Sequence, residues 1–207
     1  MKNTIIVIIA IIFVIQSCDT EEKKKSNAID YQKYKTELEN IFILDQKYRL
    51  LTDSLEMIYD WDSDTIQNTY QLEHIQDSLN LFRIERIISE IGWPKRTVLG
   101  DTATDAAFLV LQHCGNAFVM EKYVPIMQQA ADSNELSKSS LALYIDRIKM
   151  FKGQKQIYGS QMVYNDSLKK LELYPVENLE VIDSLRKSAG LKPLGEYLKS
   201  FGIEKPN

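Results

Sequence analysis

The chemistry that this sequence can support depends on polar side chains that interrupt apolar helical patterns. His113 is the best general acid or base among them, because an imidazole titrates near neutral pH with little perturbation. Asp45 and Asp146 are the carboxylates that would orient His113 or take the opposite proton-transfer role. Two carboxylates that flank one bond would also suit a glycosidase. These three residues are the candidate catalytic residues.

Other polar residues have side chains that hold a ligand rather than react with it. Guanidinium, amide and phenol groups form hydrogen bonds around a pocket, and Gly159 would let the backbone approach a ligand closely. The candidate binding residues are Arg49, Asn80, Gln112, Arg147, Gln156, Tyr158 and Gln161. We expect one cavity to be lined by Asp45, Asn80, His113, Asp146, Arg147, Tyr158 and Gln161.

Each of these residues also has a structural explanation. Asp45 and Arg49 are four residues apart and can pair on a helix surface. His113 can cap the carbonyl groups of a helix end, and Asp146 with Arg147 can brace a hairpin against a bundle. Buried polar groups are retained either because they fix one arrangement of the core or because they face a pocket. Both interpretations stay open from the sequence.

The elements that must position these residues are mostly helical. Apolar residues recur every three or four positions and predict two long amphipathic helices, Ile29–Tyr59 and Thr65–Ile91. The same pattern predicts shorter helices over Ala103–Cys114, Ala117–Ala131, Ser137–Phe151, Glu177–Ala189 and Pro193–Phe201. The first of these is apolar nearly all round, so it should be buried. We expect a capping box at Asp101 to open it, and a break at Pro125 in the next helix.

Alternating residues over Lys155–Tyr164 and Lys169–Tyr174 predict a two-stranded hairpin. A lone hairpin is marginal in water, so it must pack on helices. The predicted fold is therefore mainly α, a multi-helix bundle with one small two-stranded β-hairpin packed on it.

The stretch QIYGSQ, Gln156–Gln161, falls in the first predicted strand. Alternation would put Gln156 and Gln161 on opposite faces, unless a bulge at Gly159 shifts the pattern. We expect the stretch to belong to a site if Gly159 breaks the strand, and to be a brace if it does not.

The N-terminal residues resemble an export signal with a lipid attachment site. Lys2 precedes the apolar run Ile5–Ile15, which is too short for a comfortable membrane span. Ile15, Ser17 and Cys18 then resemble the lipobox of bacterial lipoproteins. The resemblance implies cleavage before Cys18 and attached acyl chains such as palmitate, which would hold the protein firmly on a membrane.

The chain therefore divides into three predicted parts: a signal peptide at residues 1–17, a flexible charged tether at 18–28 and a single mostly helical domain at 29–207. We expect the mature protein to lie in the bacterial cell envelope, anchored to the membrane through its N-terminal lipid.

Composition narrows the range of partners. Loss of residues 1–17 leaves 24 Lys and Arg against 29 Asp and Glu, a formal charge of −5, so nucleic acid is not an expected partner. With lipid on Cys18, Cys114 has no partner for a disulfide. The two histidines show no HExxH or CxxC spacing, and we expect neither a metal nor a cofactor.

The order of the polar motifs resembles an uncharacterised bacterial family with the signature GWP…QH…DR…QxYG[TS]Q. The matching residues, in chain order, are Asp45-Gln46-x-x-Arg49, Asp77-x-x-Asn80, Gly92-Trp93-Pro94, Gln112-His113, Asp146-Arg147, Gln156-x-Tyr158-Gly159-x-Gln161, Arg186 and Gly190-Leu191. Ser160 stands where threonine is usual and keeps the hydroxyl. The family has no established activity, so the resemblance implies the location of a site and no reaction.

Two functional hypotheses follow. The first is a non-catalytic, lipid-anchored binding or interaction protein of the cell envelope, with an unknown ligand or protein partner and a polar pocket or network. The alternative is an envelope hydrolase that uses His113 with Asp45 or Asp146. The sequence has no nucleophile elbow, phosphate loop or metal spacing, and this favours the first hypothesis.

Overall fold

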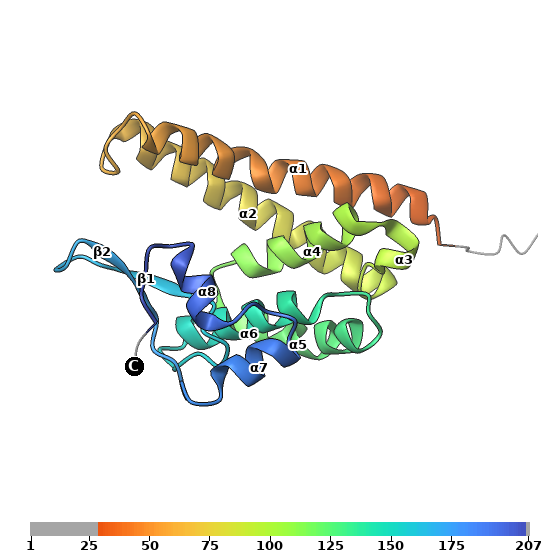
Figure 1. Cartoon of the computed structure of the whole chain (residues 1–207). Helices are drawn as coiled ribbons and strands as arrows, with labels where there is room; N and C mark the ends of the chain where they lie inside the picture. Colours follow the sequence, from red (N-terminus) through yellow and green to blue (C-terminus); the bar gives the residue numbers. More distant parts are fainter. Residues whose placement is uncertain (1–28, 206–207) are drawn as a thin grey trace, which may run out of the picture.

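The computed structural model describes residues 29–205 (Figure 1). The predicted signal peptide, Cys18 and the predicted tether lie outside the described residues. Within them the chain forms eight helices and one two-stranded antiparallel sheet, which confirms the predicted mainly α architecture. None of the helices in residues 29–205 is both long enough and apolar enough to cross a membrane.

Two long helices, α1 (Tyr31–Glu56) and α2 (Asp64–Ile91), lie side by side as an antiparallel pair (Figure 1). The side chain of Asp30 accepts a hydrogen bond from the Lys33 amide, and that of Ser63 accepts one from Ile66. These caps satisfy amide groups that a helix start leaves unpaired. The caps therefore fix where each helix begins, close to the predicted positions.

Four shorter helices follow: α3 (Arg96–Leu99), α4 (Asp101–His113), α5 (Ala117–Asp132) and α6 (Lys138–Phe151). Both α3 and α4 contact α1, and α5 packs with α6. The central helix α4 contacts α1, α2 and α6 and is mostly buried, as its apolar sequence predicted. Ile41, Ile84, Leu111 and Tyr144 belong to the main hydrophobic core that joins these layers. The C-terminal end of α4 is thereby held between the long helix pair and α6.

Two local predictions in this region are wrong. The N-cap of α4 is Gly100, and Asp101 is the first helical residue, so no capping box opens this helix. Pro125 does not break α5, which runs through it without interruption. Pro125 and Glu121 are both exposed, so water can hydrate the Glu121 carbonyl that loses its helical partner at the proline.

The C-terminal part contains β1 (Met162–Asn165), β2 (Lys170–Leu173), α7 (Ile182–Ser188) and α8 (Leu194–Lys199). The strands pair antiparallel, with Met162 opposite Leu173. Both the hairpin and α7 are shorter than predicted. Ile182, Leu194 and Leu198 form a second small core.

The stretch Gln156–Gln161 is a loop rather than the predicted strand, and only Gln156 forms an isolated bridge, to Val176. Gly159 has a φ angle of +66°, and a Cβ at this position would lie 3.0 Å from side-chain atoms of both Ile182 and Leu194. Only glycine meets both the conformation and the close packing without strain. The loop is thereby seated directly on the second core.

The apolar stripe that predicted α2 is not buried as a whole. Ile84 and Ile87 lie in the core, whereas Leu72, Ile75, Leu79 and Phe82 are exposed along one side of the helix. Their spacing of three, four and three residues keeps them on one face. This row is therefore an unpaired apolar surface of the described residues.

Candidate functional site

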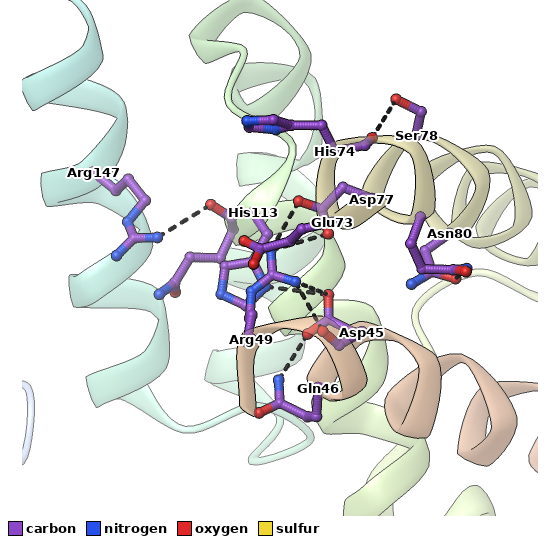
Figure 2. A network of polar contacts seen from close by, with 12 residues as sticks. Asp45, Gln46, Arg49, Glu73, His74, Asp77, Ser78, Asn80, His113 and Arg147 are labelled. Carbon is purple, nitrogen blue, oxygen red and sulfur yellow. Dashed lines mark hydrogen bonds and ion pairs between the residues drawn. The ribbon is translucent and has the colours of Figure 1, made fainter. Parts of the chain in front are cut away.

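The first polar cluster lies where α1, α2 and the end of α4 meet (Figure 2). Asp45 is buried, and its Oδ1 lies 3.2 Å from Nδ1 of His113. Its second oxygen, Oδ2, accepts a hydrogen bond of 2.7 Å from Nε2 of Gln46. A carboxylate only accepts, so the Asp45 contact places the ring hydrogen of His113 on Nδ1 and fixes the orientation of the ring.

Arg49 contributes a positive charge to this cluster, and nearby carboxylates balance that charge. Its Nη2 donates to both oxygens of Asp77, at 2.9 and 2.8 Å, and lies 3.7 Å from Oε1 of Glu73. Its Nη1 donates to the Asp45 carbonyl oxygen at 2.8 Å. Burial alone would lower the pKa of Arg49, but the hydrogen bond to Asp77 and the charge of Asp45 raise it above its ordinary value. Arg49 therefore holds α1 against α2.

Arg147 approaches the same region from α6 (Figure 2). Its Nε donates to Oε1 of Gln161 at 3.1 Å, and its Nη1 reaches the Gln112 carbonyl oxygen at 3.5 Å. Burial and the positive charge of Arg49 both lower the pKa of Arg147. Within residues 29–205 it forms no ion pair, so its charge lacks the compensation that Arg49 has.

The second polar cluster surrounds Asp146, which is fully buried. Its Oδ1 accepts from the amides of Ile157 and Tyr158 at 2.7 and 3.0 Å. Its Oδ2 accepts from the amide and the hydroxyl of Ser160 at 3.0 and 2.9 Å. Four donors around one carboxylate replace the water that burial removes. Asp146 thus fixes the loop Gln156–Gln161 on α6.

The side-chain amide of Gln156 forms hydrogen bonds that hold the same loop together. Its Nε2 donates to the carbonyl oxygens of Gln161 and Tyr174, at 3.0 and 2.6 Å, and its Oε1 accepts from the Gln161 amide at 2.8 Å. The amide side chain therefore replaces the ladder hydrogen bonds that a strand would have made here. The buried position of Gln156 is explained by this role.

Arg186 completes the second cluster from α7. This side chain is 1% exposed, and its Nη1 donates to the carbonyl oxygens of Tyr158 and Gly159, at 2.6 and 3.2 Å. Its Nε donates to the Lys192 carbonyl oxygen at 2.6 Å, and its guanidinium lies 4.7 Å from the ring centre of Tyr197. The motif order included Arg186, but helix periodicity gave no sign that it would bind the loop. The sequence also gave no sign of the hydrogen bond that the Tyr197 hydroxyl donates to the Ser160 carbonyl oxygen.

The structure thus separates the predicted site residues into two clusters. Asp45, Arg49, Gln112, His113 and Arg147 gather at the end of α4, whereas Asp146, Gln156, Tyr158 and Gln161 belong to the loop network. The bond from Arg147 to Gln161 joins the two. Asn80 is bonded to Gln76 instead, with its Nδ2 buried and unpaired.

Other sites in the described residues are poorer candidates. Residues 29–205 contain no group of three or more His, Cys, Asp or Glu side chains placed to hold a metal ion. Burial raises the pKa of the Cys114 thiol, which disfavours the reactive thiolate. Two surface hollows, one between β2 and residues 201–204 and one beside Trp93, include no predicted site residue.

A comparison with family models identifies the group of proteins to which the chain is related. The model described as a family of unknown function, DUF6624, matches residues 34–203. The chain belongs to the DUF6624 family. No curated protein and no solved structure matches it. The match spans both polar clusters of this DUF6624 chain, and it begins after the predicted lipid attachment site. It agrees with the resemblance to an uncharacterised family and adds no reaction.

Proposed function

We propose that this DUF6624 chain is a lipid-anchored binding protein of the bacterial cell envelope. Its binding site would be the first cluster, built from Arg49, Gln112, His113 and Arg147 around Asp45. The observation that carries the proposal is the half-buried guanidinium of Arg147, which has no counter-charge in the described residues.

The two clusters differ in how completely their polar atoms are satisfied. In the loop network, Asp146 and Arg186 each have several short hydrogen bonds, so the fold itself explains their presence. In the first cluster, Arg147 has one firm bond to a neutral amide, and Oε1 of Gln112 is buried without a partner. Buried polar groups without hydrogen-bond partners, and charges without an opposite charge, destabilise a protein. They are typical of surfaces whose polar groups a ligand satisfies.

Hydrolysis is the alternative, and one contact favours it: the 3.2 Å approach of Asp45 to Nδ1 of His113. This is how a carboxylate orients a catalytic histidine. However, the oxygens of Asp146 are occupied by the loop, which leaves His113 without the second carboxylate. Cys114, the adjacent thiol, has a raised pKa. Binding therefore explains more of the cluster than hydrolysis does.

Replacing Cys18 with alanine in a bacterial host is expected to remove both the acyl chains and the cleavage that the lipobox resemblance places before residue 18. The reason is that the resemblance assigns both the lipid and the cleavage to Cys18, so without this residue the apolar run Ile5–Ile15 would stay on the chain. Fractionation and intact mass of the full chain measure this. Cys114→Ala is the control and should stay in the membrane fraction. A wild type without acyl mass, or a Cys18→Ala variant that kept it, would disprove the anchor.

A further inference from the structure

We infer that the first cluster binds an oxyanion, a carboxylate or phosphate group, against the guanidinium of Arg147. The inference rests on the proposed binding function and names the chemical class of its ligand.

The distribution of charge selects Arg147 over Arg49 as the anion-binding group. Asp45, Glu73 and Asp77 all lie within 4 Å of the Arg49 guanidinium, so that side chain needs no further anion. Arg147 has only the oxygen of the Gln161 amide and the carbonyl of Gln112. A positive charge withdrawn from water without an opposite charge costs free energy, which a bound anion would recover.

The free donors of Arg147 suit an oxyanion. Its hydrogen bonds to the described residues use Nε and Nη1, and Nη2 forms none. The planar guanidinium presents Nη1 and Nη2 as a fork that matches two oxygens of a carboxylate or phosphate. Figure 2 shows this side chain reaching from α6 toward the end of α4. An anion there would face His113 and the charge of Arg49, whose carboxylate partners are already engaged.

Gln112 supplies independent evidence for a ligand at this place. Its backbone carbonyl is the acceptor for Arg147, the residue as a whole is 7% exposed, and its side-chain Oε1 has no hydrogen-bond partner in the described residues. Buried amide oxygens are rarely left unpaired in folded proteins. The unsatisfied Oε1 of Gln112 and the uncompensated charge of Arg147 are therefore two groups of the first cluster that the described residues leave incomplete.

The test is the thermal unfolding of the full chain in detergent, with sodium phosphate or sodium acetate compared against sodium chloride at equal ionic strength. We expect at least one of these anions to raise the unfolding midpoint of the wild type, because a ligand that binds only the folded state stabilises it. Arg147→Met should show a clearly smaller shift, because only the general stabilisation that phosphate gives any folded protein would remain. Arg83→Met should retain the full shift, since Arg83 is a partly exposed arginine that pairs with Glu37 away from the cluster.

Two outcomes would overturn the inference: no shift of the wild type by either anion, or an equal shift in Arg147→Met. The proposed binding function would survive either result, because the ligand could then be of another class. The anchor test and the stability of Arg147→Met without anions assess that function separately.

Discussion

Asp146→Asn is expected to lower the free energy of unfolding by about 3–5 kcal/mol, the range for breaking a buried, fully bonded charge. The carboxylate of Asp146 accepts from three loop amides and from the Ser160 hydroxyl. Asparagine has the same shape, but its NH₂ group would face amide donors, and the buried donors would lose acceptors. Urea unfolding followed by far-UV circular dichroism measures the loss.

The matched control for this prediction is Asp132→Asn, because Asp132 is exposed at the end of α5. A surface change of this kind should stay within about 0.5 kcal/mol of the wild type. A loss of less than about 1 kcal/mol in Asp146→Asn would show that the loop network does not support the fold.

Arg186→Met is expected to cost about 3 kcal/mol or more, the second largest effect. Methionine fills a similar volume, but the carbonyl oxygens of Tyr158, Gly159 and Lys192 would lose their donor in a buried place. The same unfolding experiment measures it, with exposed Lys187→Met on the same helix as control.

Asp146 and Arg186 hold opposite groups of one loop, its amides and its carbonyls. Removal of either side chain already loosens the loop, so the other side chain then stabilises it less. The double variant should therefore lose less free energy of unfolding than the sum of the two single variants. Strict additivity would mean that the loop is held in two independent parts.

The helices were predictable because their signals are local. Ser63 before α2 and Gly92 after it mark the ends of that helix in the sequence, and the structure uses both. The hairpin was overextended because the residues of QIYGSQ alternate as a strand does, while their partners lie far along the chain, on Asp146 and Arg186. The loop depends on these distant side chains, which no local pattern reveals.

The sequence was enough to select the candidate residues, but it did not predict how they are arranged in space. Asp146 and Arg147 are adjacent in sequence, and neighbours on a helix point about 100° apart. Asp146 therefore binds the backbone of the loop, whereas Arg147 reaches the side chain of Gln161 and the end of α4. Gly159 does break the extended run, and the backbone groups of the stretch are held by Asp146, Gln156 and Arg186. Whether the stretch also belongs to a site stays a prediction. Alternation of side chains could not foresee a loop held mainly by its backbone groups.

The central claim is that Arg147 serves to bind a ligand, whereas Arg186 serves to stabilise the fold. It is tested most directly by the unfolding free energy of Arg147→Met without added anions, measured beside Arg186→Met. We predict that Arg147→Met is as stable as the wild type or more stable by up to about 2 kcal/mol, because an uncompensated charge is removed. A loss of about 3 kcal/mol, equal to that expected for Arg186→Met, would contradict the claim and make Arg147 part of the structural network.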